Sequence, residues 1–101
     1  MQLSKAQIKY LKGKAQSLSP VVMIGKEGVS EATIRELARA LSDHELVKVK
    51  IQEEEREDFA RLSEELASGS GADLVQKIGR MAVYYLMNSD PKKRKIKLPA
   101  R

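Results

Sequence analysis

The chain has 101 residues, which is enough for one modest hydrophobic core and too few for a second domain. It contains no cysteine, which excludes disulfides and thiolate metal sites and is compatible with a cytosolic protein. The net charge of +5 is unevenly distributed: residues 53–65 hold seven of the 14 acidic residues, whereas residues 1–26 contain five lysines and residues 92–101 contain six basic residues. This division predicts a basic side that faces a polyanion.

Membrane insertion and export are not expected. No apolar run approaches the roughly 20 residues that span a bilayer. The N-terminal stretch MQLSKAQIKYLKGKAQ is a charged amphipathic pattern without the apolar core of a signal peptide. We therefore expect a soluble, cytoplasmic protein.

The first predicted element is a helix that begins after Ser4. Gln7 follows three residues later, as in a capping box, and Pro20 is expected to end the element. The apolar residues of this helix recur at helical spacing: Ile8, Leu11, Ala15 and Leu18. Its lysines form a second stripe: Lys5, Lys9 and Lys12.

A short strand and a second helix follow. The apolar run VVMI, residues 21–24, is typical of a buried strand. Ser30 is the expected N-cap of a helix that runs to about Ser42. Its apolar stripe is Ile34, Leu37, Ala38 and Leu41. The sequence IGKEGVS, residues 24–30, is therefore a strand-to-helix turn.

The two glycines of this turn admit two interpretations. Gly25 and Gly28 can simply form a tight turn, or they can let a phosphate approach the backbone at a helix N-terminus, with Lys26 as an added cation. Glu27 opposes phosphate contact if it points inward.

The segment ELVKVKI, residues 45–51, is predicted to be a strand. Val47, Val49 and Ile51 lie on one face, and Lys48 and Lys50 on the other. The two lysines are either the solvated side of a half-covered sheet or a contact to nucleic acid. If helices cover both faces, they must lie near an edge or end.

A third helix is predicted from about Arg56 to Ala67, with Gly69 and Gly71 as its stop. Its inward residues are Phe59, Leu62 and Leu66, and its glutamates face outward. The acidic residues at its start are compatible with the helix dipole and need no metal.

The last two predicted strands, ADLVQKI and MAVYYL, are joined by Gly79-Arg80, which suits a type II′ hairpin. Tyr84 and Tyr85 point to opposite faces, and we expect both in the core. The order of elements predicts a single α/β domain with three helices and a four-stranded mixed sheet.

Catalysis is not expected. His44, the single histidine, is interpreted as a turn residue before a strand. No nucleophile with a base and an orienting group is visible, nor a glycine loop that ends in Gly-Lys-Ser/Thr. We expect no enzymatic activity, metal, cofactor or small-molecule substrate.

Three segments of the chain carry a resemblance to a known family: LSKAQIKYLKGKAQSLSPVVMIGKEGVSEATIRELARALSDHELVKVKI, VQKIGRMAVYYL and RKIKLP. Together they resemble the CRM domain (chloroplast RNA splicing and ribosome maturation). The similarity is greatest to the stand-alone bacterial YhbY-type proteins and covers essentially the whole chain. It implies a domain over residues 1–98 and a basic C-terminal tail over residues 92–101, partly packed or flexible. It also implies a core similar to the C-terminal domain of translation initiation factor three, with a G-x-x-G loop like that of KH domains.

The resemblance implies binding of structured RNA, in bacteria at precursors of the large ribosomal subunit, by a protein that we expect to be a monomer. It assigns RNA contact to Gly25, Lys26, Gly28, Lys48, Lys50 and Arg80. The basic stripe and tail complete the predicted set: Lys5, Lys9, Lys12, Lys92, Lys93, Arg94 and Lys95. Two positions depart from the family pattern, Glu27 in the loop and Leu86, where an arginine is expected.

Selectivity is expected from RNA shape, because four aromatic residues are too few for recognition that rests mainly on stacked bases. An alternative function is protein docking, in which the acidic helix around residues 54–65 binds a basic ribosomal protein.

Overall fold

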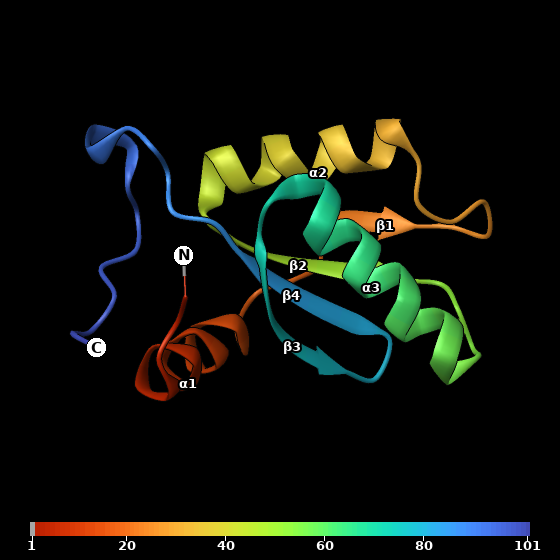
Figure 1. Ribbon diagram of the computed structural model, residues 1–101, viewed down its shortest axis with the longest axis horizontal. Helices are drawn as coiled ribbons and strands as arrows, with labels where there is room; N and C mark the ends of the chain where they lie inside the picture. The colour runs from red at the N-terminus through yellow and green to blue at the C-terminus, as the bar shows by residue number, and fades with distance from the viewer. Residues whose placement is uncertain (1) are drawn as a thin grey trace.

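The computed structural model describes residues 2–101, which fold into three layers (Figure 1). The helices are α1 (Lys5–Ala15), α2 (Glu31–His44) and α3 (Arg56–Ser70), and a short 3-10 helix covers Pro91–Lys93. The strands are β1 (Val22–Ile24), β2 (Leu46–Ile51), β3 (Asp73–Ile78) and β4 (Met81–Tyr85). They form one four-stranded sheet in the order β1-β2-β4-β3, with β1 parallel to β2 and β4 antiparallel to both neighbours. The predicted α/β domain with a mixed sheet is confirmed.

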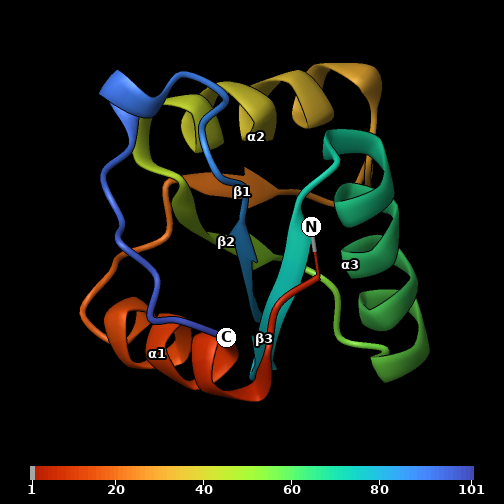
Figure 2. The ribbon, with the colours of Figure 1, turned by 60° about the vertical axis from the view of Figure 1, so that its left-hand side comes forward.

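Helices α2 and α3 cover one face of the sheet and α1 covers part of the other (Figure 2). The larger core lies under α2 and α3 and contains Val47, Val49 and Ile51 of β2. The smaller core lies under α1 and contains Leu46, Val83 and Tyr85. The alternation predicted for β2 is therefore confirmed: successive side chains enter opposite layers. No helix among residues 2–101 is long and apolar enough to cross a membrane.

The predicted N-caps of the first two helices are present. The Ser4 hydroxyl accepts from the amide of Gln7, whose side chain accepts from the amide of Ser4. Ser30 and Thr33 form the same reciprocal pair at the start of α2. Because both caps use residues three apart in the sequence, they follow from local chemistry alone.

Two expected helix ends were wrong. Helix α1 ends at Ala15, before Pro20, so Leu18 lies outside it. Helix α3 continues past Ala67 and through Gly69 to Ser70, and only the second of the two predicted stop residues, Gly71, caps it, with a left-handed φ of 76°. A Cβ at position 69 would lie 2.6 Å from the Cδ1 of Ile34, so Gly69 serves the packing of α3 on α2.

Two burial predictions were also wrong. The segment 21–24 is buried on one face only: Val21, just before β1, and Met23 are 55% and 54% exposed, because α1 packs mainly on β2, β3 and β4. Ala38 is exposed on α2, and Ala40 packs against the larger core in its place.

The hairpin between β3 and β4 turns at Gly79 and Arg80. Gly79 has a φ of 58°, and the φ of Arg80 is not positive. A type II′ turn requires this combination, a positive φ at its first central residue only. Tyr84 and Tyr85 are both fully buried, as predicted. The Tyr84 hydroxyl donates to the carbonyl of Ser63 at 2.9 Å.

The segment after β4 folds back along the domain towards α1 (Figure 2). Ile96 and Leu98 pack against the smaller core, and the Gln7 side chain donates to the carbonyl of Pro99. The main anchor is Glu45, which is fully buried between α2 and β2. Its carboxylate accepts hydrogen bonds from three backbone amides of this segment: Asn88, Lys95 and Ile96.

Candidate nucleic-acid interface

The G-x-x-G segment is a tight turn that projects from one end of the molecule (Figure 1). The amide of Gly28 donates to the carbonyl of Gly25 at 3.0 Å, and Lys26 and Glu27 are exposed between them. Gly28 has a φ of 79°, a conformation that glycine adopts at no steric cost. The segment therefore fits the first interpretation of its sequence, with Lys26 and Glu27 exposed and both glycines partly buried.

Glu27 bears directly on how an anion can approach. A Cβ at position 25 would lie 3.0 Å from the Oε2 of Glu27, so this carboxylate lies over Gly25. The cap between Ser30 and Thr33 also uses one amide of the α2 N-terminus. Binding of a phosphate at this turn therefore needs the charge of Lys26. It also requires that the exposed Glu27 side chain move aside.

Three predicted cations from different elements converge beside the turn. Lys26 of the loop, Lys50 of β2 and Arg80 of the hairpin line one open hollow of ≈ 580 Å³. Its remaining lining is Gln52, Glu53, Glu54 and Glu55. Arg80 lies 3.6 Å from Glu54 in an exposed ion pair, which is weak enough to exchange for a phosphate.

Lys48 extends this basic surface along the sheet. It lies two residues from Lys50 on the same face of β2 and lines a second hollow of ≈ 520 Å³ with Lys14, His44 and Ile96. Both β2 lysines are half-buried on a central strand, in the part of the face that α1 leaves uncovered. The two lysines were expected near an edge or an end of the sheet if helices covered both faces. They lie on a central strand, and they are only half-buried because α1 covers only part of this face.

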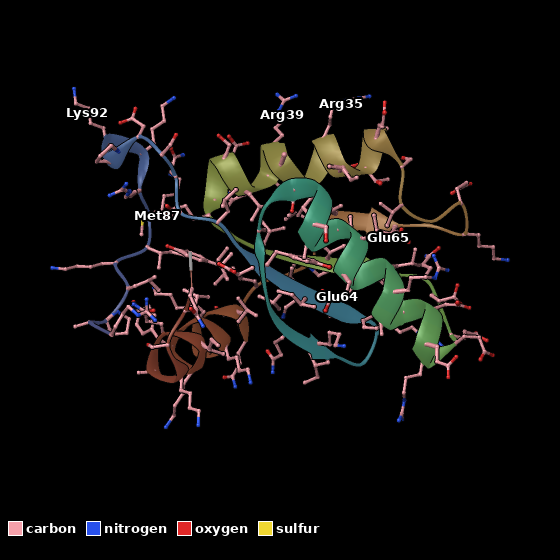
Figure 3. The ribbon with its side chains drawn as sticks, in the orientation of Figure 1. Arg35, Arg39, Glu64, Glu65, Met87 and Lys92 are labelled. Atoms are coloured by element: carbon pink, nitrogen blue, oxygen red, sulfur yellow. The ribbon has the colours of Figure 1, made fainter. Side chains whose placement is uncertain are left out.

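The other predicted cations form separate groups. Lys5, Lys9 and Lys12 are exposed on α1. Lys92, Lys93 and Lys95 line a hollow with Ser42 and Asp43, and Arg94 donates from Nε to the carbonyl of Asn88. Figure 3 shows Lys92 at the end of the molecule opposite the glycine turn. The predicted set is thus distributed along the 37 Å long axis.

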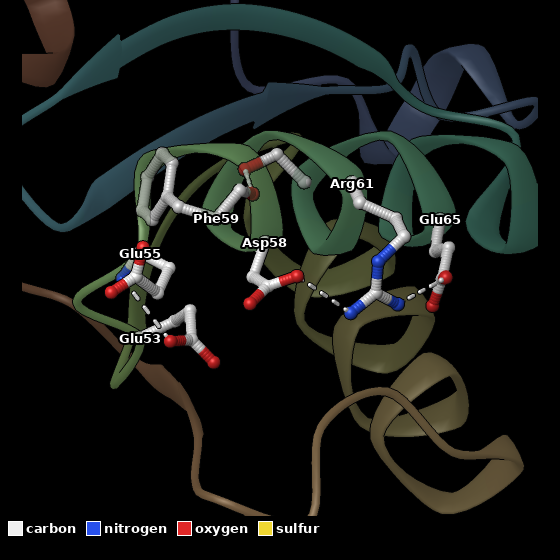
Figure 4. Close-up of polar contacts among 7 residues, drawn as sticks. Glu53, Glu55, Asp58, Phe59, Arg61 and Glu65 are labelled. Atoms are coloured by element: carbon white, nitrogen blue, oxygen red, sulfur yellow. Dashed lines mark hydrogen bonds and ion pairs between the residues drawn. The ribbon is translucent and has the colours of Figure 1, made fainter.

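Seven of the 14 acidic residues lie on α3 or in the three positions before it (Figure 4), and α3 belongs to the layer opposite α1. Arg61 donates to Asp58 and Glu65, and these hydrogen bonds raise the pKa of its guanidinium. This arrangement neutralises Arg61, so α3 presents a net negative surface. On α2, Arg35 and Arg39 point outward as well (Figure 3).

Two features of the site were missed from the sequence. Lys14 and Tyr10 are both exposed on α1, and their spacing of four residues was the signal that they share a face. The anchor at Glu45 gave no local signal, since its partners are 43 to 51 residues away. Within residues 2–101, no three His, Asp or Glu side chains are grouped so that they could hold a metal ion.

Comparison with known proteins places this arrangement in a family. Residues 3–85 match the CRS1 / YhbY (CRM) domain. The chain is 44% identical over 93 residues to the "Probable RNA-binding protein PA4753" of Pseudomonas aeruginosa, covering 92% of this chain and 89% of that protein. It is 37% identical over 97 residues to the "Probable RNA-binding protein YqeI" of Bacillus subtilis, covering 96% and 99% of the two chains.

The fold has a counterpart among solved structures. The solution structure of the hypothetical protein SAV1595 from Staphylococcus aureus superimposes with a TM-score of 0.81 and 33% sequence identity, over 97% of this chain and 100% of that chain. Sequence and structure therefore agree, and the chain belongs to the CRS1/YhbY (CRM) domain family.

Proposed function

We propose that the protein binds structured ribosomal RNA in the cytoplasm and acts in maturation of the large ribosomal subunit. The observation that carries the proposal is the convergence of Lys26, Lys50 and Arg80 on one hollow beside the glycine turn. The names of the relatives in Pseudomonas aeruginosa and Bacillus subtilis support RNA as the class of ligand. The ribosomal assignment rests on the resemblance to the stand-alone bacterial members of the family.

Binding would be driven mainly by phosphate contacts. Each lysine or arginine that meets a phosphate releases condensed counterions, which makes the affinity depend steeply on salt. At the turn, Gly28 supplies the left-handed backbone, and Gly25 leaves space for a phosphate once the exposed Glu27 side chain moves aside. Lys48 and Lys50 would continue the contact along β2, so selectivity would come from the shape of the RNA. No catalytic step is assigned.

The loop assignment is tested with two variants, Lys26→Glu and Gly28→Asp. We expect each to weaken binding of a large-subunit ribosomal RNA fragment on the order of tenfold, measured by fluorescence anisotropy at low and moderate salt. Lys77→Glu is the matched control, because Lys77 is an exposed lysine on β3 that lines none of the hollows around the site. Circular dichroism checks that each variant is folded. Unchanged affinity in both loop variants rejects the assignment.

The ribosomal part is tested separately by crosslinking in cells followed by RNA sequencing. We expect crosslinks to concentrate on precursors of large-subunit RNA. Crosslinks spread over messenger RNA would remove the maturation role and leave RNA binding in place.

A second candidate function is docking of a basic protein on α3. An open groove of ≈ 560 Å³ runs between α2 and α3, and Glu31, Glu64 and Glu65 lie along it. Under this alternative, Glu64→Lys weakens capture of a basic ribosomal protein, and Lys26→Glu does not. The two functions can coexist because the groove and the glycine turn are separate surfaces.

A further inference from the structure

The outer face of α1 carries an aromatic side chain that the proposed RNA-binding set does not include. Tyr10 is 37% exposed, whereas Tyr84 and Tyr85 are fully buried and Phe59 is 8% exposed. Tyr10 is therefore the one aromatic ring among residues 2–101 that is open to solvent. The Nζ of Lys14 lies 5.6 Å from the centroid of this ring. Lys14 lies over the ring, so a nucleobase can stack there when the exposed Lys14 side chain swings from the ring to a neighbouring phosphate.

Gly13 lies three residues from Tyr10, in the last turn of α1, and no side chain packs where its Cβ would be. A Cβ added at Gly13 would meet no atom within 4 Å, whereas one at Gly69 would lie 2.6 Å from Ile34. Glycine destabilises a helix interior relative to alanine. No residue of the protein fills the space left by the missing side chain of Gly13. This space is therefore available to a bound ligand.

These residues border one shallow hollow of ≈ 620 Å³. Its lining is Ala6, Lys9, Tyr10, Gly13, Lys14 and Pro99. Position 6 contributes only a methyl group and position 13 no side chain, so neither position fills the hollow. Two lysines and no carboxylate line it, which suits a group flanked by phosphates. A planar base with a phosphate on each side matches these three features together: the ring, the open space at positions 6 and 13, and the two cations.

We infer that α1 holds one unpaired nucleobase of the bound RNA, stacked on Tyr10 above Gly13, with Lys9 and Lys14 on its flanking phosphates. The inference rests on the proposed RNA binding and adds a requirement for an unpaired base, such as a bulge, to the backbone contacts at the glycine turn. Recognition would still rest mainly on phosphates, since one base stacks.

The test compares two RNAs, a ribosomal stem with a single 2-aminopurine bulge and the same stem fully paired. We expect the wild type to bind the bulged stem more tightly and to quench the 2-aminopurine fluorescence. Tyr10→Ala should weaken binding of the bulged stem on the order of tenfold and abolish the quenching, while Tyr10→Phe retains both. The affinity for the paired stem should not change in either variant.

Gly13→Gln separates function from stability, because it fills the hollow with a side chain that favours helix. We expect its melting temperature to rise and its affinity for the bulged stem to fall to that for the paired stem. Ala38→Gln, at an exposed position of α2, is the matched control and should leave the affinity for both RNAs unchanged. If Gly13 had only a structural role, Gly13→Gln would change the melting temperature but not the ratio of the affinities for the bulged and the paired stem.

The outcomes are distinguishable. If Tyr10→Ala and Gly13→Gln bind the bulged stem as tightly as the wild type while Lys26→Glu loses affinity for both stems, the base site is rejected and the proposed function stands. If the wild type binds neither stem, both proposals fail.

Discussion

Glu45 shows how one residue can determine the position of a basic segment. It is fully buried and has a φ of 64°, the only positive φ of a non-glycine residue within residues 2–101. Burial on its own raises a carboxyl pKa, but hydrogen bonds from the amides of Asn88, Lys95 and Ile96 and the charge of Arg94 lower the pKa of Glu45 below its ordinary value. The ionised carboxylate is therefore the form that holds the C-terminal segment against the domain.

Glu45→Gln is expected to destabilise the protein by about 2–4 kcal/mol, because the amide NH₂ of glutamine would face a backbone N–H that now donates to a carboxylate oxygen. The measurement is the free energy of unfolding in urea at neutral pH. Glu36→Gln, at an exposed position of α2, is the control and should change little. Equal stability of the two variants would mean that the buried hydrogen bonds do not hold the segment.

The same residue predicts a pH dependence. Because the folded pKa of Glu45 is depressed, its stabilisation is complete above the ordinary value of 4.5 and is lost as the pH falls through the lower folded value. The stability difference between the wild type and Glu45→Gln should therefore shrink below pH 4.5. A difference that is constant from neutral pH into the acid range would contradict the assignment of an anionic Glu45.

At the scale of elements, what could be predicted from sequence depended on how far apart the interacting residues lie. The caps at Ser4 and Ser30 and the turn at Gly79 use neighbours within four residues, and each was predicted. The end of α3 was predicted too early, at about Ala67, because Gly69 was interpreted as part of the stop, whereas it makes room for Ile34 of another helix. A glycine that ends a helix and one that lets two helices approach look alike until the packing is known.

Gly69→Ala tests this packing. Alanine favours helix, but its Cβ would lie 2.6 Å from the Cδ1 of Ile34, so we expect a net loss of stability of about 1–2 kcal/mol. Ile34→Val removes the δ-methyl, and the double variant should lose less than the sum of the two single changes, measured by thermal unfolding. A stabilised Gly69→Ala would show that Gly69, like Gly13, has no neighbour that requires it.

At the scale of the whole molecule, the separate basic groups follow one another along the long axis, and we call this series the track. The glycine turn lies at one end of the 37 Å long axis and the C-terminal cations at the other (Figure 1), with Lys48 and Lys50 between them. The residue types of this track were predictable from charge and alternation. Its course was not, because Lys26, Lys50 and Arg80 meet only through the pairing of β1, β2 and β4.

A track of this length predicts that the effect of each end depends on the length of the RNA. On an RNA long enough to span 37 Å, Lys26→Glu and Lys93→Glu should each weaken binding and lower the salt slope by about 1. Their losses should add, because distant sites do not share contacts. On a stem too short to reach the C-terminal segment from the turn, Lys93→Glu should leave the affinity unchanged while Lys26→Glu still lowers it. Titrations of the long and the short RNA over a range of salt concentrations measure the affinity loss of each of the two variants on each of the two RNAs. Equal losses from Lys93→Glu on the short and the long stem would mean that the C-terminal cations bind RNA on their own and that no single RNA needs to follow the track.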